Sequence, residues 1–260
     1  MEQSYEVKEL LGLLKTKEPL VAMLAPSFPI MFAYPQIIGK LKRLGFKYVV
    51  EVAVGAQETN RQLLELLKKE PRSRYITSPC SSIIRLIRSK YPELVKFIAP
   101  VDSPIIATAK LVSQKYPKFR PVFIGPCFVK KLEAREYPRL NILVITFSEL
   151  LHVFAATKIG DRVNDIRGKL DLQGKNTRLY PISGGLAESS EFNRLLTDEE
   201  YDVISGPKNV EKSLPEFPQN RLRVLDILYC QGGCINGVGI NSTLSIQERR
   251  QKIIDHWQMA

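Results

Sequence analysis

The four cysteines of this chain constrain its fold more than any other sequence feature. Cys80 and Cys127 stand alone, whereas Cys230 and Cys234 form a pair separated by three residues. Cys80, Cys127 and the pair each follow closely on a short run of β-branched and apolar residues, which is typical of a buried strand. We therefore expect the thiols at three strand ends. Four thiolates from separate strand ends are the ligands that a tetrahedral metal ion or an iron–sulfur cluster requires.

Short apolar strands and amphipathic helices alternate along the whole chain, which predicts an α/β architecture. The predicted strands are residues 20–25, 48–54, 74–78, 121–125, 142–147, 201–205 and 224–229. The predicted helices are residues 36–44, 58–69, 82–89, 105–115, 148–158 and 246–258. Ser148 is the expected cap of the fifth helix. The strands are almost continuous in Val, Ile and Leu, as in parallel sheets, whose ligands collect beyond the carboxyl ends of the strands.

Length and composition fit one domain, or two fused lobes, with a sizeable core. The chain has 260 residues, of which 44% are hydrophobic. No stretch reaches the roughly 18 consecutive apolar residues of a membrane span, and the N-terminus lacks the basic-then-apolar order of a signal peptide. We therefore expect a cytoplasmic protein without a membrane span. Its thiols are expected to stay reduced, and cysteines in that setting bind metal or act in catalysis more often than they form disulfides.

The net charge of +11 comes from the first half of the chain. Residues 1–139 hold 24 Lys and Arg against 12 Asp and Glu, whereas residues 140–260 hold 14 against 15. The basic half is either a solvated surface or a docking face for an acidic electron-transfer partner such as a ferredoxin. Nucleic acid is not expected as a partner, because the basic residues are spread out and no nucleic-acid motif accompanies them.

Taken alone, the cysteines leave three interpretations open: a structural zinc ion, a 4Fe–4S cube, or buried thiols without a ligand. Zinc sites usually take their thiols from two short Cys-x(2–4)-Cys pairs, and only Cys230 with Cys234 forms such a pair here. Ligands assembled over a long stretch of chain favour a cluster buried between lobes. Glycines beside the pair leave room for backbone N–H groups to approach cluster sulfurs. No histidine stands near a cysteine, so a Cys–His nucleophile lacks support.

Three segments of the chain resemble, in order, the active-site signatures of the iron-only (FeFe) hydrogenase catalytic domain. They are residues 77–80, 123–133 and 230–239. Further likeness lies at residues 25–28, 50–56, 100–104 and 183–185, so the resemblance covers nearly the whole chain. The chain is most similar to the branch of this family that is proposed to sense hydrogen rather than to turn it over.

This resemblance implies a single domain over residues 1–260, built as two intertwined lobes of about 1–120 and 121–260. Each lobe would be a small, mostly parallel twisted sheet flanked by helices, with the cluster at the lobe interface. By the same resemblance, the ligands of a 4Fe–4S cube would be Cys80, Cys127, Cys230 and Cys234.

The resemblance also implies roles for residues around the cube. In a complete H-cluster, Cys234 would bridge to a two-iron subsite that carries carbon monoxide, cyanide and a dithiolate. Lys130 matches the family lysine that contacts a cyanide ligand, and Ser103 with Pro104 matches a segment that lines this subsite. Glu133 is either an acid on a proton path or a helix-surface partner of Lys130.

Several positions depart from the pattern of active hydrogenases. The residue before the first cluster ligand, a proton-relaying cysteine in those enzymes, is Pro79 here. The acidic pair that continues the proton path is replaced by Gln62 and Leu63, and the methionine two residues before the second ligand is Gly125. Fast turnover of hydrogen needs a proton donor close to the metal, so we expect slow turnover or none.

We therefore expect an iron–sulfur protein of the FeFe hydrogenase family, with or without the two-iron subsite. Its role would be slow hydrogen oxidation and proton reduction, or hydrogen or redox sensing. The alternatives are a non-catalytic, cube-only assembly or regulatory factor and, less favoured, a structural zinc protein. No Cys-x-x-Cys-x-x-Cys repeat of the ferredoxin type occurs, so electrons are expected to come from a separate protein.

Overall fold

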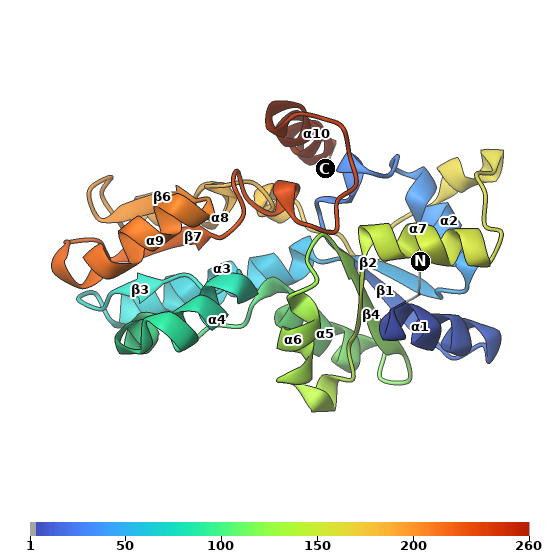
Figure 1. The fold of residues 1–260 in the computed structure, drawn as a ribbon, viewed down its shortest axis with the longest axis horizontal. Helices are drawn as coiled ribbons and strands as arrows, with labels where there is room; N and C mark the ends of the chain where they lie inside the picture. Colours follow the sequence, from blue (N-terminus) through green and yellow to red (C-terminus); the bar gives the residue numbers. More distant parts are fainter. Residues whose placement is uncertain (1–3, 260) are drawn as a thin grey trace.

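The computed structural model describes residues 4–259 and shows two small sheets, each covered by helices (Figure 1). The strands are β1 (Leu20–Leu24), β2 (Tyr48–Glu51), β3 (Tyr75–Ile76), β4 (Arg120–Gly125), β5 (Leu143–Thr146), β6 (Tyr201–Ser205) and β7 (Val224–Leu228). The helices are α1 (Tyr5–Lys15), α2 (Gln36–Leu44), α3 (Ala53–Lys69), α4 (Ser81–Lys90), α5 (Pro104–Lys115), α6 (Lys130–Arg135), α7 (Phe147–Ala156), α8 (Gly185–Ser190), α9 (Pro207–Glu216) and α10 (Ile246–Gln258). All pairings between these strands are parallel, which confirms the predicted fold class.

The first sheet has the strand order β2-β1-β4-β5 and is buried on both faces. In the middle of the sheet, Ala22 of β1 lies between Val49 of β2 and Val122 of β4. Helix α5 packs against β1 and β4, and α1 packs against both α7 and β5. Because helices cover both faces, the strands need no polar alternation, which explains their continuous Val, Ile and Leu content.

The second sheet has the order β3-β7-β6 and lies between two helical layers. On one face, residues of α3 and α8 share an apolar cluster with Val224 of β7. On the other face, residues of α4 and α9 share a cluster with Leu225 and Ile227. The side chains of β7 therefore alternate between the two layers, as a strand requires. Figure 1 shows this sheet at the left and the first sheet at the right.

The chain crosses between the two sheets more than once. The first sheet takes β1 and β2 from before residue 120 and β4 and β5 from after it. The second sheet takes β3 from before residue 120 and joins it to β6 and β7 near the end of the chain. Helix α3 links the two sheets, because it follows β2 of the first and precedes β3 of the second (Figure 1). In residues 4–259, no helix has the length and apolar content needed to cross a membrane.

Two predicted boundaries are wrong for local reasons. The strand predicted to reach residue 54 ends at Glu51, and α3 begins at Ala53 because Val52 already has helical backbone angles. The cap of α7 is Thr146 rather than Ser148. The Thr146 hydroxyl accepts from the Glu149 N–H, and the Glu149 carboxylate accepts from the Thr146 N–H, which forms a capping box. Ser148 instead lies inside the helix and donates to the carbonyl of Gly239.

Candidate metal centre

The four cysteines converge from strand ends that belong to both sheets. Cys80 follows β3 and precedes α4, Cys127 follows β4, and Cys230 follows β7. Cys234 begins a short 3-10 helix, η8 (Cys234–Asn236). Electrostatic interactions connect every pair of these four thiols, so the predicted ligands lie together. All four are free and partly buried.

Burial and neighbouring thiols make three of the four, Cys127, Cys230 and Cys234, hard to ionise. Burial, followed by the neighbouring thiols, raises the pKa of Cys230 to about 11 and the pKa of Cys234 well above its ordinary value. Burial also raises the pKa of Cys127, against an opposing effect of Lys130. Four thiolates at this place therefore need a cationic partner, such as a metal, to offset their charge. Within residues 4–259, no group of three or more His, Cys, Asp or Glu side chains has the arrangement needed to hold a metal ion.

The backbone around the cysteines fits an iron–sulfur cluster. The N–H groups of Val129 and Lys130 hydrogen-bond the Cys127 sulfur, as protein N–H groups do at clusters. Gly233 has a φ of +105°, and a Cβ there would lie 2.5 Å from the carbonyl oxygen of Pro181. This close approach requires glycine and fixes the path of the chain immediately before Cys234. An all-thiol donor set with N–H donors beside it is the pattern of iron–sulfur ligation.

Lys130 and Glu133 form a nearly buried ion pair next to the thiols. The Lys130 ammonium donates to the Glu133 carboxylate at 2.6 Å and to the carbonyl oxygen of Pro79 at 2.9 Å. The hydroxyls of Ser81 and Ser103 also donate to Glu133. Burial alone would lower the pKa of Lys130, but Glu133 and the nearby thiols raise it above the ordinary lysine value. Lys130 is therefore a cation held in a fixed position beside the cysteines.

An apolar cavity of about 80 Å³ lies beside Cys127 and Cys234. Two of the predicted subsite residues, Lys130 and Pro104, line it, whereas the Ser103 hydroxyl is turned to Glu133. Pro79 and Phe123, which lie in segments that resemble the family signatures, also line it. Tyr180, Pro181 and Leu228 line it too, and these three residues were not predicted from the sequence.

Phe123 occupies the space that Gly125 leaves open. A Cβ at Gly125 would lie 2.4 Å from the Phe123 ring. The Phe123 side chain, two residues upstream, therefore fills the volume that a side chain at position 125 would take. The aromatic ring keeps this wall of the cavity apolar.

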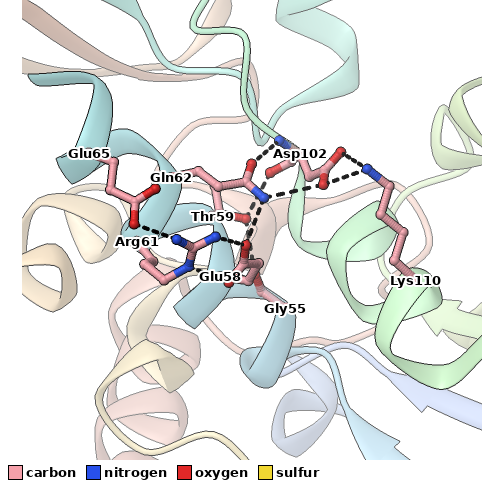
Figure 2. A network of polar contacts seen from close by, with 8 residues as sticks. All are labelled: Gly55, Glu58, Thr59, Arg61, Gln62, Glu65, Asp102 and Lys110. Carbon is pink, nitrogen blue, oxygen red and sulfur yellow. Dashed lines mark hydrogen bonds and ion pairs between the residues drawn. The ribbon is translucent and has the colours of Figure 1, made fainter. Parts of the chain in front are cut away.

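Gln62, predicted to replace a proton-path acid, links helix α3 to the segment that precedes α5 (Figure 2). Its amide N–H group donates to Glu58 at 2.9 Å, and its carbonyl oxygen accepts from the Asp102 N–H at 2.8 Å. Asp102 in turn pairs with Lys110 at 2.7 Å. The second replacement, Leu63, is buried in the apolar cluster of the second sheet. Both side chains are thus engaged in structural contacts.

The fold and the site together define the class of protein: a two-sheet α/β domain with an all-cysteine site between its sheets. Residues 18–238 match the family described as iron only hydrogenase large subunit, C-terminal domain. The match spans more than half of the chain, and the chain belongs to this family. The resemblance noted in the sequence is thereby confirmed, and membership implies iron–sulfur cofactor binding.

Relatives and solved structures agree with this assignment. The chain is 32% identical over 94 residues to the cytosolic Fe-S cluster assembly factor NAR1 of Eremothecium gossypii. That alignment covers 35% of this chain and 21% of the relative, so the chain spans about a fifth of the relative's length. A variant of the [FeFe]-hydrogenase HydA1 from Chlamydomonas reinhardtii superposes with a TM-score of 0.72 at 20% identity, covering 96% of this chain and 88% of the other. The structure of HydA(deltaEFG), solved for stepwise H-cluster assembly, gives 0.70 at 18% identity, with the same coverage.

Proposed function

We propose that the chain is an iron–sulfur protein that binds a 4Fe–4S cube through Cys80, Cys127, Cys230 and Cys234. The convergence of these four thiols from three strand ends of two sheets carries the proposal. When bound, a cube supplies one-electron redox chemistry. The role proposed for the protein is redox or hydrogen sensing, in which an electron is stored rather than spent on rapid turnover.

The residues around the thiols have separate tasks in this proposal. The Lys130 cation offsets part of the negative charge that four thiolates bring into the protein. Glu133, held by Ser81 and Ser103, keeps Lys130 oriented toward the Pro79 carbonyl. No side chain at Pro79 can donate a proton, so fast hydrogen turnover is not expected.

A complete H-cluster is the second candidate, and the cavity beside Cys234 favours it. The cavity adjoins the cysteine that would bridge to a two-iron subsite, and Lys130 and Pro104 line it as the family pattern requires. In this case the protein would oxidise hydrogen and reduce protons slowly. Infrared spectra after anaerobic maturation separate the candidates, because bands of iron-bound carbon monoxide and cyanide support the complete H-cluster. A loaded, EPR-active protein without those bands contradicts it and leaves the cube alone.

The substitution Pro79→Cys is expected to raise the rate of hydrogen evolution about 100-fold if the two-iron subsite is loaded, because a general acid typically contributes 10²–10⁴ in rate. Pro79→Ala is the matched control, since it removes the ring without adding a proton donor. The measurement is hydrogen production from reduced methyl viologen by Pro79→Cys, Pro79→Ala and the parent protein. An unchanged rate in fully loaded Pro79→Cys protein would show that the missing relay is not what limits turnover.

The relationship to NAR1 supports a cube-only assembly or regulatory factor as the alternative role. Such a factor would bind the cube and produce no hydrogen, with or without a cysteine at position 79. The Pro79→Cys experiment therefore also separates a hydrogenase lacking its relay from a protein with no hydrogen chemistry.

The electron partner is proposed to be a separate acidic protein, such as a ferredoxin, that docks beside Cys80 and Cys230. An exposed groove there is lined by Arg85 and Arg88 of α4 and by Tyr229. Helix α4 begins directly after Cys80, and Tyr229 directly precedes Cys230. Both arginines pair with one carboxylate, Glu136, so the two side chains still leave a net positive charge close to two of the thiols, which favours steered electron transfer.

Charge reversal in this groove is expected to slow reduction by an acidic ferredoxin on the order of tenfold at low ionic strength. The variant is Arg85→Glu with Arg88→Glu, and stopped-flow reduction of the loaded protein gives the rate constant. Lys68→Glu with Lys69→Glu is the control, because it makes the same change in charge at the opposite end of β3 from Cys80. Equal slowing by both pairs would argue for a general charge effect instead of this docking site. The difference between the pairs is also expected to shrink at high salt.

A further inference from the structure

Asp226 is a buried carboxylate in the middle of the second sheet. It lies on the central strand β7 and is 2% exposed, and its Oδ2 atom has no hydrogen-bond partner. The carboxylate accepts from the N–H of Ala187 and from the hydroxyl of Thr77. Thr77 in turn accepts from the Ile227 N–H at 3.2 Å, which directs its own proton toward Asp226. Within residues 4–259, Asp226 takes part in no ion pair, so its negative charge would be buried without a cation.

The position of Asp226 places this charge close to the candidate metal centre. Alternate residues of a strand share a face, so Asp226 lies on the same face of β7 as Leu228, about 7 Å farther along. Leu228 lines the cavity beside Cys234. Cys230 follows four residues after Asp226, at most about 13 Å away along an extended chain. Tyr180, another residue of the cavity wall, interacts electrostatically with Asp226.

The other side chains packed around this face are phenols, an amide and apolar groups. The titratable side chains of the apolar cluster are the phenols Tyr75, Tyr180 and Tyr201. Helices α3 and α8 contribute the neutral residues Asn60, Leu63 and Leu186. Arg223, at the start of the strand, reaches outward to Glu200 and to the carbonyl of Leu67. Asp226 is therefore the group of this face whose charge changes near neutrality.

We propose that Asp226 is a redox-linked proton site, which binds one proton when the neighbouring cluster gains one electron and releases it when the cluster is oxidised. The proposal rests on the cluster-binding function proposed above. The electron comes from an external one-electron donor and the proton from solvent, and the O–H bond of the carboxyl group is the one bond that forms. Burial raises the pKa of Asp226 to about 7, so the proton exchanges in the physiological range.

The strength of the coupling follows from the separation of the two charges. One added electron about 13 Å away, at an effective dielectric constant of about 20, tightens proton binding about tenfold. Reduction therefore moves the protonation of Asp226 to higher pH, and the midpoint potential must fall as pH rises through this window. A tenfold coupling corresponds to about 59 mV between the acidic and alkaline plateaus for a one-electron couple.

The test is a potentiometric titration of the reconstituted protein at pH values from 5.5 to 8.5, followed by the EPR signal of the reduced cluster. The midpoint potential of the parent protein is expected to fall by about 59 mV across this range, which corresponds to tenfold coupling. The midpoint potential of Asp226→Asn is expected to stay constant. Asp202→Asn, which neutralises an exposed carboxylate on the adjacent strand β6, is expected to keep the full pH dependence. A constant potential in the loaded parent protein overturns the proposal, as does an unchanged slope in Asp226→Asn.

Two further measurements keep the outcome unambiguous. Thr77→Val removes a hydrogen bond that stabilises the ionised carboxylate, so it is expected to move the pH-dependent window to higher pH. Infrared spectra of the apoprotein are expected to show a carboxylic acid band that titrates near pH 7 and is missing from Asp226→Asn. A protein that binds no cluster overturns the proposed function and the coupling with it, while this band still reports the buried proton. If the loaded protein shows the carboxylic acid band but its midpoint potential does not change with pH, the coupling is overturned and the proposed cluster binding is not.

Discussion

The substitution Cys234→Ser is expected to remove most of the bound iron. Cys234 begins η8, directly after Gly233, whose backbone packs closely against the carbonyl oxygen of Pro181. A hydroxyl is a poor ligand for iron because it does not ionise at neutral pH, and even residues that only support a metal ligand are worth 10–100-fold in affinity. Loss of a direct ligand is therefore expected to weaken cluster binding by more than about 100-fold. Iron content and visible absorbance after anaerobic reconstitution give the measurement.

Ser113→Ala, a substitution near the far end of α5, provides the control for this experiment. It keeps all four cysteines and is expected to bind as much iron as the parent protein. If Cys234→Ser bound the same amount of iron as this control, with the same spectrum, Cys234 would not be a ligand.

The substitution Arg178→Met is expected to lower the free energy of unfolding by about 3–5 kcal/mol. Arg178 is paired with Glu51 at 2.9 Å, and both side chains are almost completely buried. His256 also contacts Glu51 at 3.1 Å, and the His256 carbonyl accepts from Arg178. Removing the arginine leaves the Glu51 carboxylate in the core without its cation and frees α10, which packs against the segment that carries Cys234.

Urea denaturation of the apoprotein measures this effect, with Arg167→Met as the exposed control. That control is expected to change the free energy of unfolding by less than about 0.5 kcal/mol. The double variant Glu51→Leu with Arg178→Met is expected to recover part of the loss, because it removes both buried charges. A loss below about 1 kcal/mol in Arg178→Met would show that the buried pair contributes little to stability.

Much of the secondary structure could be predicted from local sequence. Residues 201–205 form a strand with the predicted bounds, and residues 36–44 and 246–258 form helices with theirs. These segments carry clear periodicity between turn residues, which is local information. Helices α1, α6, α8 and α9 were not predicted. Two of them, α6 and α8, are only six residues long, and short helices are stabilised mainly by tertiary packing.

Some features of the candidate site could likewise be predicted from local sequence, whereas others depend on tertiary packing. Strand-end patterns are enough to predict that Cys80 and Cys230 lie close together, because parallel strands bring their carboxyl ends to one edge of a sheet. Cys127 follows a strand of the other sheet, so its approach to them depends on how the two sheets pack. The Lys130–Glu133 pair follows from their spacing on one helix. The hydroxyls that hold Glu133 come from residues 30 and 52 positions away, which no local pattern reveals. The same holds for the Phe123 ring beside Gly125 and for the burial of Asp226, since both depend on how the layers pack.

The content of iron and acid-labile sulfide in the anaerobically purified protein tests the central claim most directly. A 4Fe–4S cube on Cys80, Cys127, Cys230 and Cys234 predicts about four iron and four sulfide per chain, with more iron if a two-iron subsite is also bound. The same analysis of a variant with all four cysteines replaced by serine is expected to give neither. One zinc per chain without sulfide, or a parent protein that binds no metal after reconstitution, would contradict the assignment of these cysteines as cluster ligands.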